Sequence, residues 1–78
     1  MVTRVAYKGR IIDAHPHELT VDRRWSTDLA IEHHDGGSIN VRPFSGVLTF
    51  GTKAQAIQHC FELGAQIIDG AYPGCSAP

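Results

Sequence analysis

The stretch Thr52–Gly64, TKAQAIQHCFELG, decides the fold because it carries the clearest helical pattern in the chain. Thr52 is a good N-cap residue, and Gln55 three positions later completes a Thr-x-x-Gln capping box. Gly64 stands where many helices end with a glycine in the left-handed conformation. The pattern therefore predicts an α-helix that begins after Thr52 and ends at Gly64.

This predicted helix has one apolar and one polar face. The apolar residues recur at spacings of three and four; they are Ala54, Ile57, Cys60 and Phe61, widened at one side by Ala56 and Leu63. The polar face consists of Gln55, Gln58, His59 and Glu62. A helix with two faces needs an apolar surface to cover its stripe, so we expect it to lie on a β-sheet.

Alternation of apolar and polar residues predicts the strands of that sheet. A period of two residues is typical of a strand with one buried face. The strands are expected at residues 3–8, 10–14, 25–33 and 38–42, with a short extended run at 47–50 and a final strand at 66–69. Residues 18–24 fit a loop and a strand continuation equally well.

The sequence Asp35-Gly36-Gly37 predicts a hairpin turn, because glycine adopts positive φ angles without steric cost. The strand that returns from this turn carries Ile39 and Val41. We expect both side chains to face inward, against Leu29 and Ile31.

The element order β-β-β-β-(β)-α-β predicts an α+β fold, an antiparallel sheet of four to six strands with one helix packed on one face. Residues 1–70 would form the domain, and residues 71–78 a flexible C-terminal tail. The expected core residues are Trp25, Leu29, Ile31, Ile39, Val41, Phe50, Ile57, Phe61 and Ile67. The other face of the sheet would be uncovered in a monomer, which favours self-association.

Length and composition indicate one small globular domain. The chain has 78 residues, of which 42% are apolar and 19% charged, so disorder is not expected. A net charge of −1 provides no overall field toward nucleic acid or an anionic membrane. Cys60 and Cys75 form no disulfide framework, and no segment has the length of a membrane span or a signal peptide. A soluble, cytoplasmic protein is the expectation.

Four segments resemble a group of short bacterial proteins without assigned function. They are GRIIDAHP (9–16), DRRWSTDLAI (22–31), FGTKAQAI (50–57) and GAQIIDG (64–70). The resemblance implies an α+β fold in which a strand-rich N-terminal part leads through an F-x-T-x-x-x-A helix into a closing I-I-D-G strand. It implies no reaction, ligand or catalytic residue.

Five histidines make the composition unusual. His15 and His17 are two residues apart, so on an extended segment both rings project from the same side, a spacing that suits a divalent metal. A structural zinc site normally has four ligands, commonly cysteines and histidines at tight spacings, and the sequence has neither a C-x-x-C pair nor two histidines separated by three to five residues. His15 and His17 are therefore the metal candidates, and exposed turn histidines are the alternative interpretation.

Catalytic patterns are weak in this sequence. His59 and Cys60 are neighbours on the predicted helix, which separates their side chains by about 100°, so they cannot act together as base and nucleophile. Cys60 is expected to be a small buried residue, the serines lack a nucleophile-elbow context, and the carboxylates are scattered. The sequence predicts no enzyme and no cofactor.

Basic residues offer a candidate nucleic-acid surface. Gly9 predicts a turn that joins the strands at 3–8 and 10–14 into a hairpin. Arg4, Lys8 and Arg10 lie on this first hairpin, and Arg42 ends the fourth strand. A sheet with such residues and nearby aromatic rings is able to contact phosphates and stack bases. The slightly negative net charge argues against this use.

These observations together favour a non-enzymatic interaction module that acts through protein contacts or self-association, with a homodimer as one form. The alternative is a binder of a small ligand, a metal or nucleic acid through the hairpin arginines or the His15/His17 pair. No membrane partner is expected.

Overall fold

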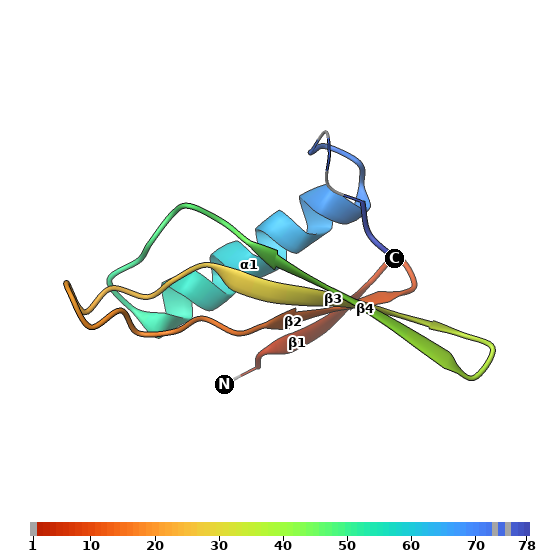
Figure 1. The fold of residues 1–78 in the computed structure, drawn as a ribbon, viewed down its shortest axis with the longest axis horizontal. Coiled ribbons are helices and arrows are strands. Elements are labelled where there is room, and N and C mark those ends of the chain that lie inside the picture. Colours follow the sequence, from red (N-terminus) through yellow and green to blue (C-terminus); the bar gives the residue numbers. More distant parts are fainter. Residues whose placement is uncertain (1, 73, 75) are drawn as a thin grey trace.

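The computed structural model describes residues 2–72, 74 and 76–78 and shows an α+β fold. Four strands form one antiparallel sheet in the order β1-β2-β3-β4, and a single helix lies across one face (Figure 1). The elements are β1 (Arg4–Tyr7), β2 (Arg10–Ala14), β3 (Asp28–Asp35), β4 (Ser38–Ser45) and α1 (Lys53–Ile68). The predicted fold class is confirmed.

Two tight turns set the registers of the β1–β2 and β3–β4 hairpins. Lys8 and Gly9 have φ angles of +48° and +79°, and Gly36 and Gly37 have +54° and +94°. Two successive residues with positive φ are typical of the type I′ turn, whose twist matches that of paired strands. Asp35 consequently pairs with Ser38, and the rest of the β3–β4 register follows from this pair.

The hydrophobic core lies between α1 and the two central strands. From the sheet come Ile12, Ala14, Leu29 and Ile31, and from the helix Ile57, Cys60, Leu63 and Ile67. Gly64 is the point of closest approach, because a Cβ atom placed there would lie 2.7 Å from Cγ2 of Ile12. The glycine thus lets the helix backbone settle directly onto β2.

The predicted end of the helix and the strand at 66–69 are wrong. The apolar stripe continues past Gly64 to Ile67, so α1 runs to Ile68. The left-handed residue is Gly70, with φ of +79°, and the N–H of Ala71 donates to the carbonyl of Gln66 at 2.9 Å. These contacts form a Schellman motif with its left-handed residue at Gly70 instead of Gly64.

The inward orientation predicted for Ile39 and Val41 is also wrong. The Asp35–Ser38 pair places Phe44 opposite Leu29 and Arg42 opposite Ile31. Side chains that are paired across strands share a face, so the odd-numbered residues of β4 point away from α1. Both aliphatic side chains are therefore exposed rather than part of the core.

The remaining differences concern the loops and the partly buried aromatic residues. The extended run at 47–50 forms no ladder strand, and Trp25 precedes β3 instead of starting it. Trp25 and Phe50 exchange two backbone hydrogen bonds of 2.7 and 2.9 Å, which join the loop before β3 to the segment before α1. Trp25, Phe50 and Phe61 are partly buried, and Ala54 is exposed. Residues 18–24 form a loop.

Candidate interaction surface

β4 is one of the two edge strands of the sheet, and α1 does not cover it. α1 packs over β2 and β3, while nearly every side chain of β4 is exposed. Figure 1 shows the β3–β4 hairpin extending away from the helix. The surface features of this flank are an apolar groove beside α1 and a free strand edge.

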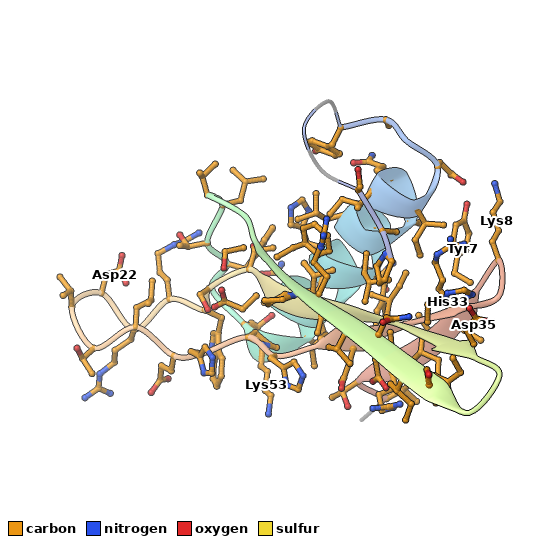
Figure 2. The ribbon with its side chains drawn as sticks, turned by 45° about the vertical axis from the view of Figure 1, so that its right-hand side comes forward. Tyr7, Lys8, Asp22, His33, Asp35 and Lys53 are labelled. Carbon is orange, nitrogen blue, oxygen red and sulfur yellow. The ribbon has the colours of Figure 1, made fainter. Side chains whose placement is uncertain are left out.

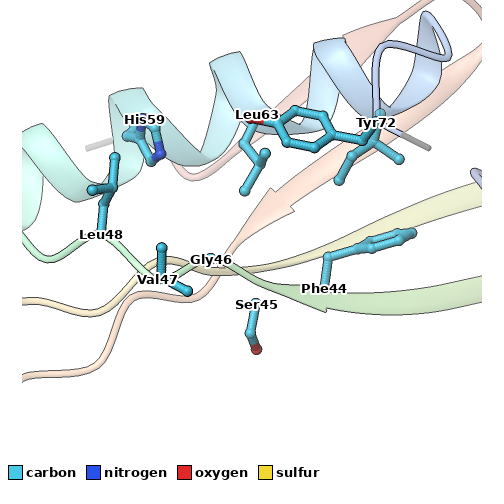
Figure 3. Close-up of a pocket in the computed structure, with 9 residues that line it drawn as sticks. Phe44, Ser45, Gly46, Val47, Leu48, His59, Leu63 and Tyr72 are labelled. Carbon is cyan, nitrogen blue, oxygen red and sulfur yellow. The ribbon is translucent and has the colours of Figure 1, made fainter. Parts of the chain in front are cut away.

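The groove lies between α1 and the chain that runs from the end of β4 into the following loop. It has a volume of about 460 Å³. Figure 3 shows Phe44, Gly46, Val47 and Leu48 on one side and His59, Leu63 and Tyr72 on the other. Its lining is mostly apolar, so it suits apolar groups of a ligand or a partner.

Thr27 holds the outer wall of this groove in place. Its hydroxyl donates to the carbonyl of Leu48 at 2.8 Å, and its own carbonyl accepts from the N–H of Gly46 at 2.8 Å. A Cβ atom on Gly46 would lie 3.0 Å from Cγ2 of Thr27 and 3.3 Å from Cδ2 of Leu63. The missing side chain at Gly46 therefore leaves room for the groove.

Polar groups are few at the groove. The ring of His59 lies 5.0 Å from that of Phe50, centroid to centroid. Within the part of the chain that the structure describes, the His59 side chain makes no hydrogen bond to protein, so its ring nitrogens are available to a bound group. Val47 is the most exposed of the large apolar lining residues, with 96% of its surface accessible.

The edge of β4 presents unpaired backbone groups. The N–H of Gly46 points toward β3, since it donates to Thr27, and in an antiparallel ladder this direction alternates along the strand. The N–H and C=O groups of Ile39 and Val41 consequently point outward. Pro43 occupies the next outward position, where its missing N–H costs no bond to β3.

The sheet face opposite α1 carries a charged network. Arg4 Nη1 lies 3.1 Å from Asp13 Oδ2 and 2.9 Å from Glu32 Oε2. His15 Nε2 lies 3.2 Å from Asp13 Oδ2, and His34 Nε2 lies 3.5 Å from Glu32 Oε1. This network covers the β1–β3 half of the open face, while Ile39 and Val41 lie on its β4 half.

The structure gives the predicted metal pair no complete ligand set. His15 is paired with Asp13, and the backbone N–H of His17 donates to Ser26 at 2.9 Å. Among residues 2–72, 74 and 76–78, no three histidine, cysteine or acidic side chains are grouped so as to hold a metal ion. Metal binding at His15 and His17 stays a prediction.

The predicted nucleic-acid residues do not share one surface. Arg4 lies on the open face in its ion pairs, whereas the strand register places Arg10 and Arg42 on the helix side. Arg10 donates to the carbonyl of Pro78 at 2.7 Å, and Arg42 donates to that of Ser76 at 3.1 Å. Lys8 is paired with Asp69.

The hydrogen bonds from Arg10 and Arg42 hold Pro78 and Ser76 of the C-terminal segment against the sheet. The predicted flexibility of residues 71–78 stays a prediction.

The buried thiol of Cys60 is unsuited to act as a nucleophile. Burial raises its pKa to about 11, although its hydrogen bond to the carbonyl of Asp28 acts in the opposite direction. The thiol is therefore protonated at neutral pH. Cys75 lies outside the described residues.

Asp28 organises the end of the sheet next to the groove. Its carboxylate accepts hydrogen bonds from the hydroxyls of Ser26 and Ser45. Partial burial raises the pKa of Asp28, but these two hydrogen bonds and the nearby His17 and His15 outweigh it, so the pKa lies below its ordinary value. The side chain thus joins the loop before β3 to the last residue of β4.

Comparison with known proteins returned no match among family models, curated proteins or solved structures. The resemblance to short bacterial proteins therefore stays a prediction. No helix in the described part of the chain combines the length and the apolar character needed to cross a bilayer.

Sequence reasoning missed both features of the β4 flank. The lining of the groove comes from β4, the loop after it, α1 and Tyr72, and no local pattern joins these segments. The sequence did contain a signal for the strand edge. Pro43 within an alternating run is typical of an edge strand, and this marks β4 as the flank of the sheet.

Proposed function

We propose that the protein is a non-enzymatic interaction module that associates with a second copy of itself through the β4 flank. The observation that carries this proposal is the exposure of Ile39 and Val41, at 59% and 56%, beside the outward backbone groups of an edge strand. Exposed aliphatic residues beside the unpaired backbone groups of an edge strand are the usual basis of strand-to-strand association.

Light scattering across micromolar to millimolar protein, with reductant present, tests this proposal. We expect the mass to rise from 8.5 kDa toward twice that value as concentration increases. A mass that stays at the monomer value over the whole range would overturn it.

A pair of valine substitutions locates the surface. Val41→Asp should restore the monomer, because it places a charge within the apolar contact. The control is Val21→Asp, at a residue that is 97% exposed in the loop of residues 18–24, far from β4. The control should leave the mass unchanged, and a similar loss in both variants would argue against the β4 flank.

Binding of a small apolar ligand in the groove is the second candidate function. Its volume of about 460 Å³ lies within the roughly 300–1,000 Å³ typical of ligand sites. An apolar fluorescent dye with an anionic group, such as anilinonaphthalene sulfonate, is a direct probe. Val47→Asp should abolish its fluorescence gain while Val21→Asp preserves it; an equal signal in both variants would contradict this function.

A cytoplasmic location is part of the proposal. It is supported by the free thiol of Cys60 inside the core, which suits a reducing compartment. Recovery of the native protein with cytoplasmic markers after gentle lysis is the expected result, and recovery outside the cytoplasm would contradict it.

A further inference from the structure

We infer that the second copy binds edge to edge, in one defined register. β4 of one copy pairs antiparallel with β4 of the other about a two-fold axis beside Asn40, so that Ile39 of each lies opposite Val41 of the other. The two sheets then form one continuous sheet of twice four strands. This inference rests on the proposed self-association and adds the partner strand, the register and the charges that select it.

The backbone of β4 is prepared for this pairing. The N–H and C=O groups of Ile39 and Val41 point away from β3, as the direction of the Gly46 bond to Thr27 requires. No backbone hydrogen bond to another described segment uses them. Opposed in the register above, the two residues of each copy exchange both of their hydrogen bonds with the other copy.

Pro43 limits the length of the ladder. It occupies an outward position but has no N–H, so a register that pairs it with a strand residue of the second copy leaves that residue's carbonyl without a donor. In the register about Asn40, Pro43 falls beside Gly37 of the second copy, within the turn. The missing donor then costs nothing, and the glycine leaves room for the proline ring.

The open face supplies an apolar contact. Ile39 and Val41 point to this face, and each would stand beside its counterpart across the new ladder, within the roughly 5 Å at which cross-strand side chains interact. Their neighbours on β3 are His34 and Glu32. The four aliphatic side chains would therefore form two short cross-strand rows of two, each with His34 of one copy at one end and Glu32 of the other copy at the other end.

The helix-side face supplies the charges that choose the register. Arg42 would lie beside Ser38 of the second copy, whose own partner on β3 is Asp35. Adjacent strands are about 4.8 Å apart, so a guanidinium group reaches across the small serine to that carboxylate. Figure 2 shows Asp35 near the tip of the β3–β4 hairpin, at the outer end of the sheet. The two-fold axis makes this contact twice.

Registers that pair more residues of the two β4 strands lose these ion pairs. A shift by two residues places Arg42 beside Asn40 and His33 of the second copy, which carry no negative charge. A shift by four residues places Arg42 directly opposite Arg42 of the second copy, and like charges in that position are destabilising. The ladder about Asn40 alone among these registers combines full backbone pairing with opposite charges.

The contact involves few residues, so we expect a weak dimer. Interfaces well below the standard size are typical of transient complexes.

Arg42 has enough N–H groups to bind both Ser76 of its own chain and Asp35 of the second copy, because its bond to the carbonyl of Ser76 uses one of five donors.

Val41→Pro tests the edge pairing directly. Proline at this outward position removes the intermolecular N–H and leaves the bonds to β3 intact, as the native Pro43 at an equivalent position shows. The matched control is Val41→Thr, which keeps the N–H and the β-branched shape. Light scattering should give a monomer for Val41→Pro and a dimer for Val41→Thr, with the same circular dichroism spectrum in both.

A charge exchange tests the register. Arg42→Glu and Asp35→Lys alone should each weaken dimerisation by roughly tenfold, because each places two like charges together in both symmetric contacts. The double variant Asp35→Lys/Arg42→Glu restores opposite charges and should return the dissociation constant to within a few-fold of the original. A double variant no better than the single ones would overturn the register.

The outcomes separate this inference from the proposed function. If the native chain dimerises and Val41→Pro dimerises equally well, the edge pairing is wrong and self-association stands. If the native chain is a monomer at every concentration, both are wrong. A thermal melt of each variant shows whether it is folded, and Asp35→Lys/Arg42→Glu keeps the inference testable if Val41→Pro does not fold.

Discussion

β3 and β4 are neighbours in the same sheet and have the same length of eight residues, yet their aliphatic side chains have opposite environments. Leu29 and Ile31 of β3 are buried under α1, whereas Ile39 and Val41 of β4 are exposed on the other face. One tight turn joins the two strands, and in both strands successive side chains alternate between the two faces of the sheet. The difference shows that the position of a strand in the sheet, and the register set by its turn, decide whether an isoleucine stabilises the fold.

Truncation of the two isoleucines gives the largest expected contrast. Ile31→Ala should lower the free energy of unfolding by about 2–5 kcal/mol, because it opens a cavity in the core. Ile39→Ala removes the same atoms from an exposed position and should change it by less than about 0.5 kcal/mol. Urea denaturation at low micromolar protein, where the chain is monomeric, measures both values. Similar losses at the two sites would show that β4 is as well covered as β3.

The contact between Gly64 and Ile12 tests how closely α1 lies on the covered half of the sheet. Gly64→Ala places a methyl group 2.7 Å from Cγ2 of Ile12. Overpacking costs roughly 1–3 kcal/mol, and the better helix propensity of alanine returns up to about 1 kcal/mol. We therefore expect a net loss of about 1–2 kcal/mol in the free energy of unfolding.

Two comparisons control for this substitution. Gly51→Ala, at a glycine with open space around its Cβ position and no positive φ, should be nearly neutral. In an Ile12→Ala background the clash is absent, so Gly64→Ala should become neutral or stabilising. A loss that persists in that background would mean that the close approach of α1 to β2 is not the cause.

Local signals in the sequence were sufficient for the start of the helix and the turns. Thr52 accepts the backbone N–H of Gln55 at 3.2 Å, as its N-cap position predicts. The end of the helix was predicted wrongly, because a glycine is equally suited to a C-terminal cap and to close packing. Only the sheet beneath Gly64 distinguishes these two roles.

The orientation of β4 failed for a related reason. Alternation shows which residues share a face but not which face is covered, and a shift of one residue exchanges the two. The Asp35–Ser38 pair decides the matter, together with the buried neighbours on β3. The groove depends on contacts between distant segments, which one sequence does not encode locally. The separation of Arg4 from Arg10 and Arg42 depends on the registers of the strand pairs.

A substitution of Thr27, the residue before β3, tests whether this side chain holds the wall of the groove. Thr27→Val keeps the shape of this residue but removes the hydroxyl that donates to the carbonyl of Leu48. The free energy of unfolding should fall by about 1 kcal/mol, the usual net value of one hydrogen bond. Amide hydrogen exchange should increase at residues 47–49 and stay unchanged in β2. If the exchange rate increases equally at residues 47–49 and in β2, or increases in neither, the loop is held by other contacts.

The opposite flank of the sheet is joined to α1 by polar contacts, and these give the smallest expected effect. Tyr7 donates its hydroxyl to Asp69 at 2.7 Å, and Lys8 is paired with the other carboxylate oxygen. Figure 2 shows Tyr7 and Lys8 together at the outer end of the sheet. The hydrogen bond from Lys8, followed by that from Tyr7, holds the pKa of Asp69 below its ordinary value.

The sign of the resulting pH dependence follows from that lowered pKa. The contribution to stability is complete above the pKa of about 3.9 that aspartate has in the unfolded chain, and it is lost as the pH falls through the lower folded value. Lys8→Met should raise the pKa of Asp69 toward its ordinary value in a carboxyl-detected NMR titration. Lys53→Met, which removes a charge above the Trp25 ring at the other end of α1, should leave it unchanged. An Asp69 pKa that is the same in both variants would mean that the β1 flank, like the β4 flank, lacks a charged link to the helix.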